Sequence, residues 1–152
     1  MTHPLSATVA VIEGLPVPSP GDAEAIESRI RYALGSEERT GDWEISIALM
    51  SDDDLRRLHR DFLGLDTVTD IMTFPFGGDV QGGDIAISVD RASEQAPEFG
   101  MTAWEEICFI AVHGVLHLSG WDDGDHESRG RMLARQAEIV RDWRRHERAG
   151  SS

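Results

Sequence analysis

The sequence predicts an α+β domain: a small four-stranded mixed sheet with helices packed on it. The chain has 152 residues, 40% of them hydrophobic, and shows no internal repeat. A chain of this length suits one domain with a single core, so residues 1–152 are expected to fold as one unit. Segments with strand and helix periodicity follow in the order β-α-β-α-β-β-α-α-α, which favours this class.

The strands are predicted from short apolar segments bounded by turn residues. Residues 43–49 alternate apolar and polar side chains, as a half-buried strand does. The other predicted strands are residues 8–12, 70–74 and 84–88. Pro75 is expected to close the third strand, and the glycine-rich residues 77–83 are expected to form a flexible connection.

The helices are predicted from capping residues followed by apolar periodicity. Asp22 and Ser51 can each accept a hydrogen bond from the first turn of a helix, and three aspartates after Ser51 suit the positive end of the helix dipole. The predicted helices start at or near Asp22, Ser51, Thr102 and Asp125, with a short helix that ends near Ala96. The helix after Thr102 is long, apolar and central to the predicted site.

The charge of the chain is strongly acidic and unevenly distributed. The formal net charge is -14, which argues against a general nucleic-acid binder. Residues 1–128 hold 7 Arg against 25 acidic residues, whereas residues 129–152 hold 7 Arg against 3, and the chain has no Lys. Arginine makes forked contacts with phosphate. The last helix is therefore either a solvated face or a local phosphate-binding groove, whose nearest arginines to the predicted site are Arg129, Arg131 and Arg135.

The sequence also predicts the compartment. No apolar run approaches the roughly 20 residues of a membrane span. The N-terminus lacks the basic start and apolar core of a signal peptide. Cys108 is the only cysteine and lies in an apolar helical run, where a small buried side chain is expected. A cytoplasmic protein without a membrane partner is the expectation.

A metal site is predicted from residues 113–123. His113 and His117 are four residues apart, so a helix places them on one face, where they can bind one ion. Gly120 can end that helix and turn the chain so that Asp122 or Asp123 approaches the same ion. Two imidazoles, one carboxylate and an open position are the ligand set of a catalytic zinc site. The alternative is two unrelated imidazoles with ordinary partners.

The third ligand is predicted from spacing. Asp123 lies ten residues beyond His113, which lets the chain cross the face that carries both imidazoles. Asp122 would then point elsewhere and accept a hydrogen bond from a ligating imidazole. His126, three residues on, is a rival ligand, with a solvent-facing position in the last helix as its alternative.

The residue after the first histidine restricts the chemistry. A zinc peptidase of the H-E-x-x-H type carries its general base there, but this chain has Gly114. Peptide hydrolysis by that route is therefore disfavoured. A metal that lowers the pKa of bound water and polarises a substrate oxygen remains, and phosphodiester hydrolysis suits it.

Three blocks of the chain resemble the YbeY family, the bacterial endoribonucleases of ribosomal RNA maturation. They are residues 113–122 (HGVLHLSGWD), 66–74 (DTVTDIMTF) and 83–88 (GDIAIS). They come in the family's order, and the resemblance covers about residues 58–132. It implies a hydrolase, a single-strand-specific, metal-dependent endoribonuclease of small-subunit ribosomal RNA 3′-end maturation and ribosome quality control. The implied cofactor is one zinc ion; the implied partners are ribosomal RNA and the small ribosomal subunit with its proteins.

The resemblance also assigns residues. It implies His113, His117 and Asp123 as metal ligands, with Asp123 in place of a third family histidine. It implies His113, His117 and Asp122 as the catalytic set, with Glu127 as a second candidate base. The family arginine that holds phosphate is replaced by Leu63. Arg60, one helical turn earlier, is the predicted substitute, and Arg129 is the second predicted substrate contact.

A second function stays open beside the nuclease. The altered ligand and the missing arginine are also compatible with a non-catalytic ribosome assembly factor in which zinc only ties the helix to its turn.

Overall fold

The computed structural model describes residues 4–13, 15–18, 21–64, 69–121 and 124–149. Its elements, in chain order, are β1 (Leu5–Glu13), α1 (Ala23–Ser36), β2 (Gly41–Met50), α2 (Asp52–Leu63), β3 (Ile71–Pro75), β4 (Gln81–Ser88), α3 (Val89–Gln95), the 3-10 turn η1 (Ala96–Phe99), α4 (Ala103–Leu118) and α5 (His126–Ala149). The predicted order is confirmed, with η1 as an addition.

The four strands form one mixed sheet in the order β1-β2-β4-β3. β1, β2 and β4 run parallel, with Val9 beside Ile45 and Ile47 beside Ile85. β3 joins β4 by a hairpin and is antiparallel, with Thr73 beside Ile85. The predicted α+β class with a small mixed sheet is therefore confirmed.

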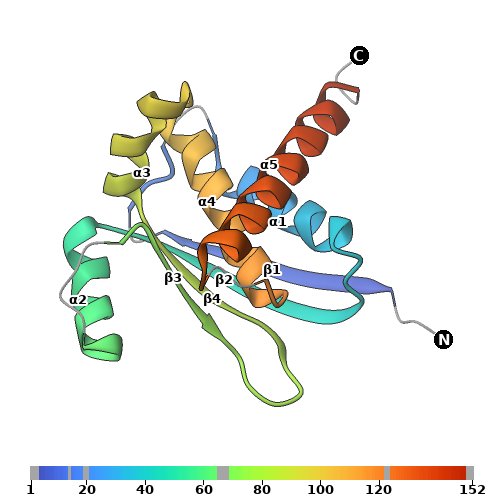
Figure 1. Cartoon of the computed structure of the whole chain (residues 1–152), viewed down its shortest axis with the longest axis horizontal. Helices are drawn as coiled ribbons and strands as arrows, with labels where there is room; N and C mark the ends of the chain where they lie inside the picture. Colours follow the sequence, from blue (N-terminus) through green and yellow to red (C-terminus); the bar gives the residue numbers. More distant parts are fainter. Residues whose placement is uncertain (1–3, 14, 19–20, 65–68, 122–123, 150–152) are drawn as a thin grey trace.

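Helices cover the two faces of the sheet unequally (Figure 1). The buried side chains of β2 (Trp43, Ile45, Ile47 and Leu49) belong to the main core, together with apolar side chains of α1 and α4. The opposite face carries a smaller cluster of Leu55, Met72 and Ala86, formed where α2 packs on β3 and β4. The main core thus lies between the sheet and the layer that contains α4.

α4 is the central helix of that layer. Thr102 and Glu105 form a capping box at its start, because each side chain accepts from the other residue's backbone N–H. Gly114 lets the helix approach the sheet closely, since a Cβ there would lie 3.0 Å from side-chain atoms of Ile71 and Ile85. α5 packs on α4 from outside through Met132 and Ile139, which are buried in the same core.

Two boundaries differ from expectation. β1 extends to residues 5–13, and β4 begins at Gln81, so the glycines at 82 and 83 are strand residues and not a loop. A side chain at Gly82 would collide with the backbone carbonyl of Glu44 on β2. These glycines therefore allow close pairing of strands where the sequence pattern indicated a turn.

Among the described residues, no single helix is long and apolar enough to cross a membrane. Residues 89–99 and α4 meet that criterion only as a pair, across a bend of 105°.

Candidate metal centre and its cavity

His113 and His117 lie one turn apart on α4, close to its C-terminal end. Their rings meet edge to face, with centroids 4.8 Å apart and planes at 77°. Gly120 then ends the helix at φ 105°, a backbone conformation that favours glycine. The N–H groups of Trp121 and Gly120 donate to the carbonyls of Leu116 and His117 at 2.9 and 3.0 Å. This Schellman-type end confirms the predicted turn after the histidines.

Gln136 of α5 fixes the protonation pattern of His113. The Gln136 side-chain Nε2 donates to the backbone oxygen of Phe109 at 2.8 Å, which sets the direction of the amide. The amide oxygen Oε1 therefore faces His113 Nδ1, at 2.9 Å. Since Oε1 only accepts, Nδ1 carries a hydrogen, and in a neutral ring the lone pair is then on Nε2. A neutral imidazole held in this way is the form that binds a metal.

Two imidazoles thus lie on one face of α4, as predicted for a pair of metal ligands. The predicted third ligand, Asp123, lies outside the described residues, as does Asp122, the predicted catalytic carboxylate. Within the described part of the chain, no group of three His, Cys, Asp or Glu is arranged to hold a metal. His126 is exposed at the start of α5 and does not complete such a group with the two histidines. The two described imidazoles are of a ligand type that zinc accepts.

A cavity of about 480 Å³ opens beside His113. β3, α3 with η1, α4 and α5 all contribute to its walls. The apolar side chains that line it are Ile71, Phe99, Phe109, Ile110 and Leu133. The polar side chains that line it are Asp70, Gln95, Glu106, His113, Arg129 and Gln136. We call this space the His113 cavity. Its size and its mixture of apolar walls with few polar groups are typical of a ligand site.

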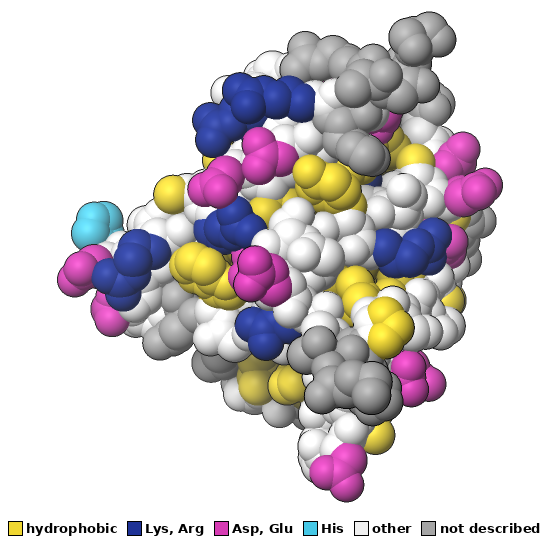
Figure 2. All heavy atoms as spheres, turned by 90° about the vertical axis from the view of Figure 1, so that its right-hand side faces the viewer, with side chains coloured by type: hydrophobic (Ala, Val, Ile, Leu, Met, Phe, Trp, Pro, Cys, Tyr) yellow, Lys and Arg dark blue, Asp and Glu magenta, His cyan; other side chains and the backbone are white. Residues whose placement is uncertain are grey.

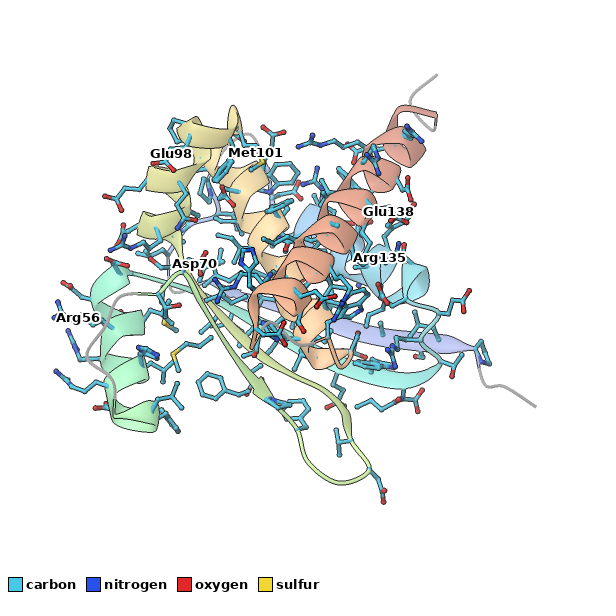
Figure 3. The ribbon with its side chains drawn as sticks, viewed as in Figure 1. Arg56, Asp70, Glu98, Met101, Arg135 and Glu138 are labelled. Carbon is cyan, nitrogen blue, oxygen red and sulfur yellow. The ribbon has the colours of Figure 1, made fainter. Side chains whose placement is uncertain are left out.

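Glu106 is a buried acidic side chain of the cavity. It lies on α4, seven residues before His113, and is 3% exposed. Burial raises the pKa of its carboxyl group above the ordinary value, and the nearby Asp70 carboxylate raises it further. Figure 3 shows Asp70 at the start of β3, in the region between α3 and the first turns of α5. The cavity therefore holds two carboxyl groups in different environments, which is a frequent feature of functional sites.

The arginines of α5 divide into two sets. Arg135 donates to Glu37 at 2.7 Å, to Glu138 at 2.7 Å and to the Ser36 carbonyl at 2.9 Å, and Arg131 pairs with Glu127 at 2.9 Å. Arg129 lines the His113 cavity and forms no ion pair with a described side chain. Of the three arginines predicted to form a basic groove, only Arg129 reaches the His113 cavity; Arg131 and Arg135 are engaged elsewhere.

Arg60 lies apart from the histidines. It is exposed on α2, 3.7 Å from the Asp61 carboxylate, and lines a separate hollow with Asp53, Arg56 and Arg57. Figure 3 shows Arg56 of the same helix pointing away from the molecule. The predicted substitution of Arg60 for the missing arginine stays a prediction, and Arg60 does not line the His113 cavity.

Three residues of this site, Glu106, Gln136 and Asp70, were not predicted as site residues. Glu106 is an acidic residue in an apolar helix and lies at i−7 from His113, on the same face. Gln136 is a polar residue between the core positions Met132 and Ile139 of α5. Asp70 was assigned only to a strand. Phe99 could not be found by pattern, because η1 was not predicted.

The fold and the site together define a small α+β domain with a histidine pair on its central helix, beside an open cavity of mixed polarity. Comparison with known proteins agrees with this. The family model for Endoribonuclease YbeY matches residues 17–144. An Endoribonuclease YbeY from Bacillus pumilus is 31% identical over 134 residues, which cover 79% of this chain and 84% of that protein. One from Gloeobacter violaceus is 38% identical over 114 residues, 68% of this chain and 59% of that protein.

A solved structure shares the fold. The solution structure of TM1509 from Thermotoga maritima has a TM-score of 0.57 and 26% sequence identity, with 91% of this chain and 93% of that chain covered. The chain belongs to the Endoribonuclease YbeY family.

Proposed function

We propose that this protein is a zinc-dependent endoribonuclease that cleaves single-stranded RNA at the His113 cavity. One observation carries the proposal: Gln136 holds His113 as the Nδ1–H tautomer on the helix face shared with His117, beside an open cavity. The relatives described above are named endoribonucleases, which supports the reaction class.

The roles of the residues follow from their chemistry. His113 and His117 would hold the ion, with Asp123 as the proposed third ligand. When bound, zinc would supply Lewis-acid stabilisation of a phosphoryl group. Arg129, which is exposed and lines the cavity, would hold a phosphate oxygen by a forked contact. Asp122 is proposed to accept a proton, with Glu127 as the second candidate.

The acidic surface requires that binding be local. Arginine and acidic side chains are interspersed on the face shown in Figure 2, without one large positive field. With a net charge of -14, bulk attraction to RNA is unfavourable. We therefore propose that few phosphates are contacted, which predicts a shallow dependence of affinity on salt.

The proposed biological substrate is the 3′ end of small-subunit ribosomal RNA, during maturation and ribosome quality control in the cytoplasm. A partner that presents the RNA would offset the unfavourable overall charge. The small ribosomal subunit and its proteins are the proposed partners.

The test combines metal content with cleavage. The purified chain is assayed for bound metal and for cleavage of a single-stranded RNA that spans the 3′ end of the small-subunit rRNA precursor, with a duplex as comparison. His113→Ala and His117→Ala are expected to lose bound zinc and at least about a hundredfold in cleavage rate, because two of three ligands cannot retain a catalytic ion. His59→Ala on α2 is the matched control and should keep both.

The ligand assignment is tested in the same assay. Asp123→Ala should lose zinc, whereas His126→Ala should keep it. A folded, zinc-bound wild type that cleaves no RNA with any divalent metal would refute the nuclease and favour the non-catalytic assembly factor.

A further inference from the structure

The His113 cavity contains an unused polar group two turns of α4 away from the histidine. The carboxyl oxygen Oε2 of Glu106 is buried and has no hydrogen-bond partner among the described residues. Its side chain nevertheless lines the cavity. A buried polar atom without a partner is unfavourable, so its place at a cavity wall points to a ligand that supplies one.

Two aromatic rings also line the His113 cavity. Phe99 on η1 is 66% exposed, and Phe109 on α4 is half-buried. Both rings also line a neighbouring hollow of about 410 Å³ that includes Arg141 and Arg144 of α5. Arg144 also donates to Glu105 at 3.4 Å, and Arg141 is exposed. Exposed rings beside arginines are an arrangement by which proteins hold single-stranded nucleic acid, with bases stacked on rings and phosphates near cations.

We propose that the His113 cavity binds one unpaired nucleobase that carries an exocyclic amine next to a ring-nitrogen acceptor, that is, cytosine or adenine. The base would stack on Phe99 and present its edge to Asp70 and Glu106. This inference rests on the proposed function, because it identifies which nucleotide of the RNA the site selects.

The hydrogen-bonding pattern explains the selectivity. Asp70, as a carboxylate, accepts from an amine. Glu106 has a buried Oε2 without a described partner, and burial raises the pKa of its carboxyl group; when protonated, it can donate to a ring nitrogen. Uracil reverses both groups, since it presents a carbonyl where cytosine has an amine and an N–H where cytosine has an acceptor. Arg129 lines the same cavity and suits the phosphate next to the base.

The test compares two RNAs that differ only in these groups. Fluorescein-labelled r(C)10 and r(U)10 are titrated with the purified full chain, and affinity is measured by fluorescence anisotropy, with RNA integrity checked on a gel. Cytosine and uracil have the same size and stack similarly. We expect r(C)10 to bind roughly tenfold more tightly than r(U)10, the discrimination of one well-formed base contact.

Variants assign the preference to named residues. Asp70→Ala and Glu106→Leu each should reduce the preference to about threefold or less, because neither replacement can form a hydrogen bond with the cytosine edge. Asp79→Asn, an exposed residue between β3 and β4, is the matched control and should keep it. Phe99→Ala should weaken both RNAs about tenfold alike, and Phe99→Trp should restore them.

Clear results would overturn the proposal. They are equal affinity for r(C)10 and r(U)10, an unchanged preference in both carboxyl variants, or unchanged affinity in Phe99→Ala. If Glu106→Leu fails to fold, as judged by circular dichroism, the half-buried Asp70 decides through Asp70→Ala. A protein that discriminates the bases but cleaves no RNA retains the base site and loses the nuclease function; one that cleaves without discrimination does the reverse.

Discussion

Two buried polar regions lie along the contact of α4 with α5, and they differ in whether they are closed. At one, the Arg29 guanidinium lies between the rings of Trp104 and Trp143, with its carbon 4.3 and 3.3 Å from the two centroids. The cavity there is about 10 Å³, hardly more than one water can occupy. At the other, His113, Gln136 and Glu106 border a cavity of about 480 Å³.

The contact between α4 and α5 thus contains one region suited to stability and one suited to binding. Two tryptophans leave Arg29 only 8% exposed, so the attraction of its cation to the rings contributes to folding. At the other region the α5 positions facing the cavity are Arg129, Leu133 and Gln136, which leave the polar groups of α4 accessible. The Arg29 region is thus expected to respond to substitution through stability and the His113 cavity through binding.

The largest change in stability is expected from a substitution in the closed region. Arg29→Ala removes two ring contacts and the buried stem of the side chain, so we expect a loss of about 3 kcal/mol in the free energy of unfolding, more than a hundredfold in the folding constant. Urea denaturation measures it. Arg31→Ala, an exposed arginine of the same helix, should change stability by less than about 0.5 kcal/mol. Equal losses in the two variants would contradict the role given to the ring contacts.

The thiol of Cys108 reports whether this region is closed. Burial raises the pKa of Cys108 from 9.0 to about 11, an effect that Arg29 only partly offsets. At pH 8 the folded chain should therefore contain roughly a hundredfold less thiolate than the unfolded chain, and alkylation by iodoacetamide should be slower by at least that factor. Mass spectrometry with and without urea measures the two rates. Similar rates in both states would show that the region opens readily.

A substitution of Gln136 tests the His113 cavity through the affinity for zinc. Gln136→Leu removes the acceptor for His113 Nδ1–H, so zinc affinity should fall by about 10- to 100-fold while the fold is kept. Gln136→Glu retains an acceptor and should retain most of the affinity. Chelator competition measures the affinity.

A second measurement separates positioning from packing in this variant. In the metal-free wild type, nitrogen chemical shifts of His113 should show the Nδ1–H tautomer, and Gln136→Leu should show a mixture of tautomers. A mixture already present in the wild type would contradict the role of Gln136.

The order of elements could be read from the sequence because each signal was local. Asp22, Ser51 and Thr102 cap their helices as predicted, since capping depends on a few neighbouring residues. The histidine pair and the Gly120 turn are local for the same reason. The family resemblance added the reaction class, which no local signal could supply.

The cavity could not be predicted in this way because it is built from distant segments. Gln136 and His113 are 23 residues apart, and their contact depends on how α5 crosses α4. Asp70 meets Glu106 only because β3 pairs at the edge of the sheet beside α4. The two sets of α5 arginines likewise differ only in which neighbours the fold gives them.

The smallest change in stability is expected from the titration of Glu105 and Glu106, two adjacent glutamates of α4 in different environments. Burial, reinforced by Asp70, raises the pKa of Glu106 above 4.5, so the folded chain holds this proton more tightly than the unfolded chain. Its contribution to stability is present below pH 4.5 and is lost as pH rises through the raised pKa. Relative to Glu106→Gln, the wild type should lose unfolding free energy as the pH rises from 4.5 through the raised pKa of Glu106.

Glu105 should show the opposite slope. The backbone N–H of Thr102 donates to its carboxylate and lowers the pKa of Glu105 below 4.5. Its contribution is present above pH 4.5 and is lost as pH falls through the lowered pKa. Urea denaturation of the wild type, Glu105→Gln and Glu106→Gln from pH 3 to pH 8 measures both slopes. The other charged groups of the cavity, Asp70, His113 and Arg129, are common to all three proteins, so they cancel in the comparison. Slopes of the same sign for Glu105 and Glu106 would mean that Glu106 is solvated and that the cavity wall at Glu106 is open to water.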